Sequence, residues 1–158
     1  MEHNSKTEIT TDNGKLSRYL WTFGIVYSLG IVLTMAALFV LDIEGNSGVA
    51  VVILIAAAYY TAMKFVNDRK RVFTPQEKSK MVWLSLLLSV VISLVVTLGS
   101  FYVLAGEEGM QYLYEVGATL PPLAWLAIVG FVLLLQYAVL YFSYGSMAKK
   151  YYKKIAES

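Results

Sequence analysis

Four long apolar stretches without a charged side chain restrict this sequence to one kind of fold. They cover about 19–41, 49–63, 81–105 and 121–144, and no Asp, Glu, Lys or Arg occurs inside them. A helix needs roughly 20 predominantly apolar residues to cross the ~30 Å hydrocarbon core of a bilayer. Such helices satisfy all their backbone hydrogen bonds internally, as lipid requires. We therefore expect an all-α fold, an integral membrane four-helix bundle.

The first two spans depart from a typical membrane helix in length or in the residues around them. The second is the shortest, so we extend it to residues 49–66, with Lys64 reaching toward the headgroups. The first is longer than the core of a signal peptide, and no A-x-A-like cleavage site follows it, so we expect it to be retained.

Composition agrees with membrane insertion, because 58% of the 158 residues are hydrophobic and only 15% are charged. A single soluble domain of this size could not bury so much apolar surface.

Charge is distributed unevenly between the two sides of the spans. All 13 Lys and Arg residues lie in the N-terminal tail, around the segment between the second and third spans, or after residue 144. The charged residues of the two remaining loops are all acidic, namely Asp42, Glu44, Glu107, Glu108 and Glu115. Basic residues near span ends resist translocation, so both termini are expected in the cytoplasm. The chain then divides into a polar cytoplasmic tail (1–18), the bundle (19–144) and a basic cytoplasmic helical extension (145–158), in the inner membrane of a bacterium.

Sequence signals also mark where helices begin. Thr74-Pro75-Gln76-Glu77 has the pattern of a capping box with proline at the first helical position, which starts the third helix near residue 75. The Pro121-Pro122 pair starts the fourth, with Thr119 as a candidate cap. We expect the stretch between them, 106–120, to be a connecting loop, with a short interfacial helix as the alternative.

Polar side chains inside the spans are few and are regularly spaced. Small polar residues recur every four positions along the third span, and one amide lies deep in the fourth; these residues are Ser85, Ser89, Ser93, Thr97 and Gln136. Small hydroxyl residues on one helix face allow close packing and hydrogen bonds between helices in lipid. We expect a packing face within one bundle. A homo-oligomer interface and a polar path for a solute are the alternatives.

The cytoplasmic side offers a second set of candidate residues. Nine basic side chains could contact anionic headgroups or a membrane protein partner, namely Arg69, Lys70, Arg71, Lys78, Lys80, Lys149, Lys150, Lys153 and Lys154. The simpler interpretation is that they only set the topology. Nucleic acid is not expected as a partner.

The sequence offers little material for catalysis. It has no cysteine, its single histidine is His3 in the polar tail, and no carboxylate lies inside a span. Thiol chemistry, buried haem ligation, intramembrane metal centres and carboxylate-coupled transport are therefore disfavoured. We expect no catalytic, cofactor-binding or metal-binding residues, and hence no enzyme.

One region resembles a known family. Phe65-Val66, Arg69 to Phe73, Thr74-Pro75-Gln76-Glu77-Lys78 and Lys80-Met81 are similar to the central segment of the ABZJ-type family. This is a family of small four-span bacterial inner-membrane proteins of unknown biochemical function. The number of spans, the loop lengths and the basic Tyr-Gly-Ser-Met-Ala-Lys-Lys tail extend the resemblance over most of the chain. It implies a four-span fold, no catalytic residues and a role in supporting cell-envelope integrity.

The function expected from these observations is that of a non-enzymatic accessory or scaffold protein acting through protein or lipid contacts. Two alternatives stay open. One is a small transporter or channel for a neutral or lipophilic solute, and the other is an immunity protein against a membrane-active toxin.

Overall fold

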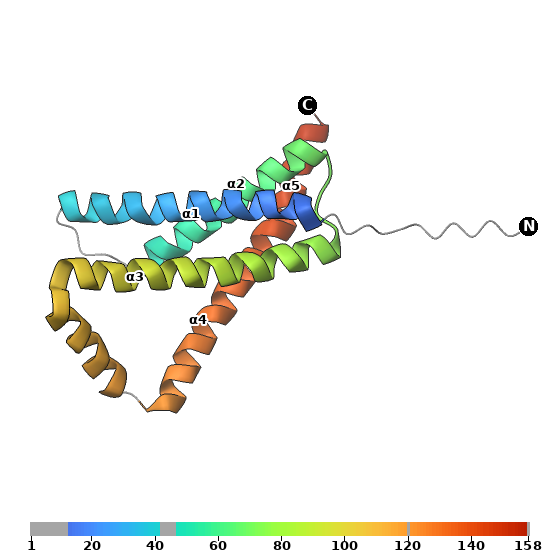
Figure 1. Ribbon diagram of the computed structural model, residues 1–158. Coiled ribbons are helices and arrows are strands. Elements are labelled where there is room, and N and C mark those ends of the chain that lie inside the picture. Colours follow the sequence, from blue (N-terminus) through green and yellow to red (C-terminus); the bar gives the residue numbers. More distant parts are fainter. Residues whose placement is uncertain (1–12, 42–46, 120, 158) are drawn as a thin grey trace, which may run out of the picture.

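The computed structural model describes residues 13–41, 47–119 and 121–157, and these ranges form helices but no strand (Figure 1). In chain order the elements are α1 (Asn13–Leu41), α2 (Ser47–Arg69), α3 (Pro75–Thr119), α4 (Pro122–Phe142), the π-helix η1 (Ser143–Met147) and α5 (Ala148–Ala156). Four stretches are long and apolar enough to cross a membrane, namely Leu16–Leu38, Gly48–Arg69, Pro75–Ser100 and Pro122–Ala156. The predicted all-α fold with four apolar helices is confirmed. Most of the predicted polar tail, together with Asp42 and Glu44, lies outside the described residues.

The helices alternate in direction, as successive membrane crossings must. In Figure 1, α1 and the first part of α3 lie side by side and run the same way, while α2 packs against α1, crosses it obliquely and runs in the opposite direction. The helix formed by α4, η1 and α5 crosses obliquely and contacts both α2 and α3. The beginnings of α1 and α3 and the ends of α2 and α5 therefore meet at one end of the molecule, which we call the basic end.

A chain of aromatic rings packs the basic end. Tyr19 of α1 lies edge-on to Phe65 of α2 at 5.1 Å between ring centroids, and Phe65 stacks on Phe73 at 3.8 Å. Phe73, from the loop between α2 and α3, in turn meets Tyr144 of η1 at 5.6 Å. All four side chains are buried. Aromatic pairs add stabilisation beyond the apolar area they bury, so this row fixes α1, α2, the loop and η1 against one another.

The loop between α2 and α3 ends in the capping box expected from the sequence. The Glu77 amide donates to Thr74 Oγ1 at 3.3 Å, and the Thr74 amide donates back to Glu77 Oε2 at 2.9 Å. α3 begins at Pro75, where proline has no amide hydrogen to leave unsatisfied. The reciprocal bonds satisfy two amides that would otherwise lack partners and fix the start of the helix.

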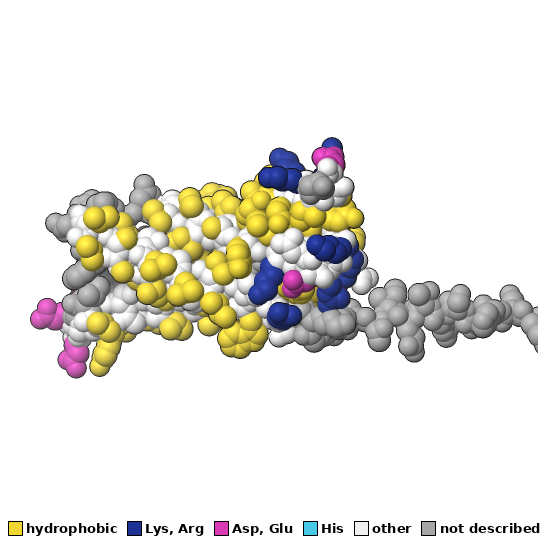
Figure 2. All heavy atoms as spheres, turned by 90° about the horizontal axis from the view of Figure 1, so that it is seen from above, with side chains coloured by type: hydrophobic (Ala, Val, Ile, Leu, Met, Phe, Trp, Pro, Cys, Tyr) yellow, Lys and Arg dark blue, Asp and Glu magenta, His cyan; other side chains and the backbone are white. Residues whose placement is uncertain are grey.

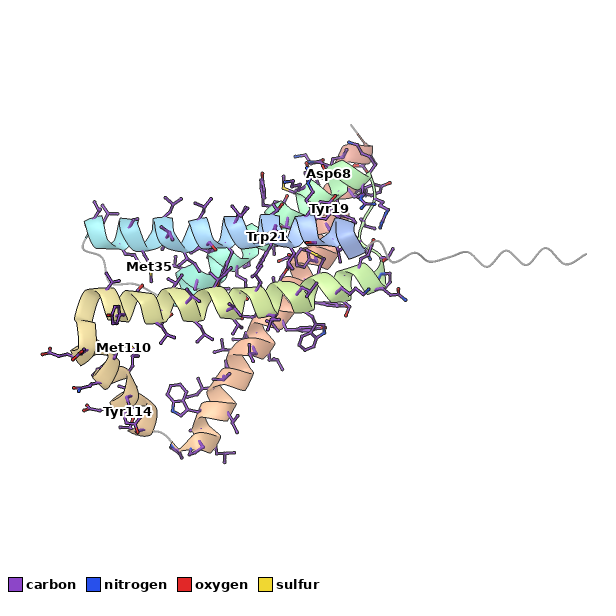
Figure 3. The ribbon with its side chains drawn as sticks, viewed as in Figure 1. Tyr19, Trp21, Met35, Asp68, Met110 and Tyr114 are labelled. Carbon is purple, nitrogen blue, oxygen red and sulfur yellow. The ribbon has the colours of Figure 1, made fainter. Side chains whose placement is uncertain are left out.

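The other end of the molecule is more open. α3 bends at Gly106, whose φ of 57° and ψ of −143° only glycine adopts without strain. The chain then continues as helix to Thr119 and carries Met110 and Tyr114 away from α1 (Figure 3). The expectation of a connecting loop over 106–120 is therefore wrong for this stretch. Acidic Glu107 and Glu108 stand in the first turn after the bend, where the helix dipole favours negative charge.

α4 begins at Pro122 without a side-chain cap. The proposal that Thr119 caps this helix is wrong, because its hydroxyl donates to the Val116 carbonyl oxygen at 2.7 Å and completes the preceding turn instead. Trp125 makes the link across the junction, and its Nε1 donates to the Gly117 carbonyl oxygen at 2.9 Å. Most of α4 is exposed, and Leu140 is its one buried side chain among the described residues.

Candidate functional site

The serine face of α3 is used mainly for packing at the basic end. Ser85 is fully buried, and its hydroxyl shares a 2.9 Å hydrogen bond with the hydroxyl of Tyr144. Ser89 is also buried and donates to the Leu86 carbonyl oxygen at 2.9 Å. Ser93 is half-buried and shares a 3.0 Å hydrogen bond with Tyr27 of α1. The small side chains thus join α3 to α1 and η1, as close packing in lipid favours.

The other two members of that candidate set lie apart from this packing. Thr97 is exposed. Gln136 of α4 is half-buried, and its buried Oε1 has no hydrogen-bond partner among the described residues. The five residues therefore do not act as one set. The hydroxyls of Ser85 and Ser93 bond to η1 and α1, and Ser89 is buried but bonded within α3. Among the described residues, neither Thr97 nor Gln136 makes an interhelical hydrogen bond.

The basic candidates gather on one surface. Figure 2 shows dark blue side chains concentrated at one end of the molecule, a mostly apolar flank, and acidic side chains at the opposite end. Three elements contribute: the end of α2 with its loop, the first turns of α3, and α5. Their residues are Arg69, Lys70, Arg71, Lys78, Lys80, Lys149, Lys150, Lys153 and Lys154.

Arg71 has a structural role in this surface. Its two terminal nitrogens donate to the two carboxylate oxygens of Glu77, each at 2.7 Å. The guanidinium also lies 5.3 Å from the centroid of the Phe65 ring. Donating these hydrogen bonds to the Glu77 carboxylate raises the pKa of Arg71 above its ordinary value. A bidentate pair of this kind fixes both partners in direction, so it holds the loop against the start of α3.

The acidic residues near this surface also have partners within the chain. Asp68 accepts a hydrogen bond from the hydroxyl of Tyr19 at 3.2 Å, and the two residues lie together in Figure 3. Glu157 lies 3.6 Å from Lys153 at the end of α5. By contrast, Lys70, Lys150 and Lys154 are exposed, and their ammonium groups have no hydrogen-bond or ion-pair partner among the described residues. The surface therefore retains positive charge that the described chain does not neutralise.

α5 presents its lysines outward because its other face is packed. Tyr151 exchanges hydrogen bonds with the Asn67 side chain of α2, at 3.2 Å and 3.3 Å. Ala148 is buried, and Tyr151 and Ile155 pack against the core. Lys149, Lys150, Lys153 and Lys154 share the exposed face. The last turns of the helix are thus fixed, and their charges are held at defined positions.

Lys78 differs from the other lysines because it is half-buried. Its Nζ lies 3.2 Å from the centroid of the Tyr141 ring, a cation–π contact. Its side chain passes over Gly145 so closely that a Cβ at that position would come within 2.7 Å of Nζ. Sequence reasoning missed Tyr141, Gly145 and Ser146, which border this lysine. Nothing in the sequence could have indicated them, because the π-helix that positions two of them depends on packing.

These features define an all-helical, multi-pass membrane protein with a rigid, basic end and a loosely packed opposite end. Within the described ranges, no three His, Cys, Asp or Glu side chains come together as a metal-binding group. Compared with protein-family models, curated proteins and solved structures, the chain gives no match.

Proposed function

We propose that the chain is a non-enzymatic accessory protein of the bacterial inner membrane, which docks an acidic surface of a protein partner on its basic end. In this proposal both termini and the basic end face the cytoplasm, as the distribution of charge favours. Support for cell-envelope integrity, which the family resemblance implies, would follow from holding that partner at the membrane.

The observation that carries the proposal is uncompensated positive charge on a rigid support. Lys70, Lys150 and Lys154 are exposed without described partners, on elements that the aromatic row and the Arg71–Glu77 pair hold in place. Lysines that project from a fixed backbone can select a partner by electrostatic complementarity, and the backbone that carries them needs no ordering on binding. A topology signal alone does not require this fixed arrangement.

The transporter alternative has less support. It needs the serine face to line a path for the solute, yet Ser85 and Ser89 are buried and bonded inside the core. Flux into proteoliposomes is the measurement that separates it from docking. The immunity alternative predicts a toxin as the partner, so it is resolved by identifying that partner.

The test is recovery of the tagged full-length chain from native membranes in a mild detergent, followed by mass spectrometry of the co-purifying proteins. We expect a stoichiometric protein partner with the wild type. The triple variant Lys70→Gln, Lys150→Gln and Lys154→Gln should lose it. This variant keeps ten of the 13 basic residues, so its orientation should not change.

The matched control removes three charges at the opposite end, through Glu107→Gln, Glu108→Gln and Glu115→Gln. All three glutamates are exposed, and this control should retain the partner. The proposal fails if the wild type brings no protein with it, or if the lysine variant retains the partner as well as the control does.

A further inference from the structure

A cavity lies at the basic end where α3, η1 and α5 meet. It has a volume of about 450 Å³ and is bordered by Phe73, Pro75, Lys78, Tyr141, Ser146 and Lys149, among others. These residues come from the loop after α2, the first turn of α3, the last turn of α4, η1 and the first turn of α5. Because so many elements contribute, the cavity has a defined shape.

The cavity is positively charged. Lys78 and Lys149 border it, and none of its lining residues is acidic. Neither ammonium group has a hydrogen-bond or ion-pair partner among the described residues, although the Lys78 ammonium contacts the face of the Tyr141 ring. Glu77 adjoins Lys78 in sequence, but both of its carboxylate oxygens are occupied by Arg71. Ser146 adds a hydroxyl that has no described hydrogen bond. Two ammonium groups and a hydroxyl are donors suited to phosphate oxygens.

A second row of aromatic rings extends from the cavity along the outer surface of α4 and α3. Tyr141 borders the cavity and stacks on Tyr137 at 6.1 Å, and Tyr137 lies 5.4 Å from Trp83. Tyr141 is 50% exposed and Trp83 is 59% exposed. Trp and Tyr are typical of the level at which headgroups meet acyl chains. A ligand with a phosphate in the cavity could therefore lay an acyl chain along these rings.

We propose that this cavity binds the phosphate-bearing headgroup of an anionic phospholipid, with Lys78 and Lys149 as its charged contacts. The exposed rings of Tyr141 and Trp83, with Tyr137 half-buried between them, favour a lipid, because an acyl chain can contact them and a free phosphate ion cannot. Gly145 is part of the site, because only a residue without a Cβ lets Lys78 lie across η1 to Tyr141. The inference deepens the proposed use of the basic end but does not require a protein partner, so either one can fail alone.

The experiment measures lipid binding beside the cavity through the fluorescence of Trp83, which brominated acyl chains quench on contact. Trp21→Phe and Trp125→Phe leave Trp83 as the single tryptophan of the full-length chain. The purified chain is placed in phosphatidylcholine nanodiscs with increasing fractions of phosphatidylglycerol brominated on its acyl chains. A parallel series with brominated phosphatidylcholine measures contact without headgroup preference. We expect brominated phosphatidylglycerol to quench Trp83 at a roughly 25-fold lower fraction than brominated phosphatidylcholine, from about fivefold for each of the two lysines.

Two double variants, each of which removes two positive charges, test whether the preference for phosphatidylglycerol arises at the cavity. Lys78→Gln with Lys149→Gln should remove it, at about fivefold for each lysine. Lys153→Gln with Lys154→Gln lies on the same α5 helix, outside the residues that border the cavity, and should retain most of it. Equal losses in the two pairs would mean diffuse attraction by the whole basic end and would overturn the proposal.

A third variant keeps the charge and changes only the geometry. Gly145→Ala displaces Lys78, whose flexible end can move without disturbing the backbone. Its circular dichroism should match that of the wild type, and its phosphatidylglycerol preference should fall severalfold. An unchanged preference in this folded variant would contradict the assigned position of Lys78.

The last arm tests free phosphate as the ligand. Inorganic phosphate is added to chain in phosphatidylcholine nanodiscs and followed by its ³¹P line width. We expect no broadening that depends on Lys78 and Lys149. Broadening that the double variant abolishes, without any preference for phosphatidylglycerol, would assign the cavity to a soluble phosphate and overturn the lipid proposal.

Discussion

The hydroxyl oxygens of Ser85 and Tyr144 lie 2.9 Å apart in the buried core, and their hydrogen bond joins α3 to η1. Tyr144 is also the last ring in the aromatic row that begins at Tyr19. One side chain thus connects the polar and the aromatic packing of the basic end.

Tyr144→Phe keeps the ring and removes the hydroxyl, so it tests the polar contacts of that hydroxyl, of which the bond to Ser85 is the principal one. We expect the free energy of unfolding in bicelles to fall by about 1 kcal/mol, the scale of interhelical hydrogen bonds in membranes. Tyr114→Phe makes the same change at a side chain that is 80% exposed, and should have no effect. Equal effects of the two substitutions would show that the Ser85 bond contributes nothing.

Glu77→Ala removes both the acceptor of the capping box and the partner of Arg71. We expect a loss of about 1–2 kcal/mol of stability, together with faster amide hydrogen exchange in the first turn of α3. Gln76→Ala is the control, because Gln76 is exposed in the same turn and has no described hydrogen bond. If amide hydrogen exchange in the first turn of α3 is as slow in Glu77→Ala as in Gln76→Ala, the capping role of Glu77 is contradicted.

Gly30→Ala tests the close approach of α1 and α2. The added Cβ would lie 2.5 Å from Cγ2 of Ile53, a β-branched side chain with little rotamer freedom. We expect the free energy of unfolding to fall by about 1–3 kcal/mol through overpacking. Gly99→Ala on α3 meets nothing within 4 Å and should be tolerated. If both alanines are tolerated alike, the helices do not approach as described.

Gln136→Leu tests the amide oxygen that lacks a partner. Replacing an unsatisfied polar group by an apolar one of similar size removes a desolvation cost. We expect thermal stability in detergent to stay the same or to rise slightly. A clear fall would reveal a partner for Gln136, such as a second copy of the chain, and cross-linking would then identify it.

Orientation can be measured with single thiols, since the chain has no cysteine of its own. Gln76→Cys lies at the basic end and Tyr112→Cys lies beyond the bend at Gly106, and both positions are exposed. In intact spheroplasts a membrane-impermeant maleimide should label Cys at position 112, whereas position 76 should react only after lysis. The reverse pattern would place the basic end outside.

The four helices could be predicted because the bilayer imposes both their length and their apolarity. The start of α3 at Pro75 could be predicted because Thr74 and Glu77 act within one turn. The bend at Gly106 also has a sequence signal. Glycine at the end of an apolar run, followed by Glu107 and Glu108, is typical of one helix ending and another beginning, so a second helix after Gly106 could have been predicted in place of a loop.

Other features depend on contacts that spacing does not encode. The four-residue repeat places Ser85, Ser89 and Thr97 on one face of α3, but it does not say which helix covers that face or how far along. Ser85 is buried and bonded to Tyr144 of η1, whereas Thr97, further along the same face, is exposed. The cavity at Lys78 was equally unpredictable, since it needs η1, Gly145 and Tyr141 together.

The oblique course of the helix formed by α4, η1 and α5 lengthens its path through a bilayer. If the bilayer normal follows α1 and α3, this helix is tilted, and a tilted helix needs more residues than an upright one to cross the same thickness (Figure 1). The helix supplies them, because the stretch that is apolar enough to cross a membrane is 35 residues long, against 23 residues in α1. One bilayer thickness can therefore accommodate both an upright α1 and an inclined α4.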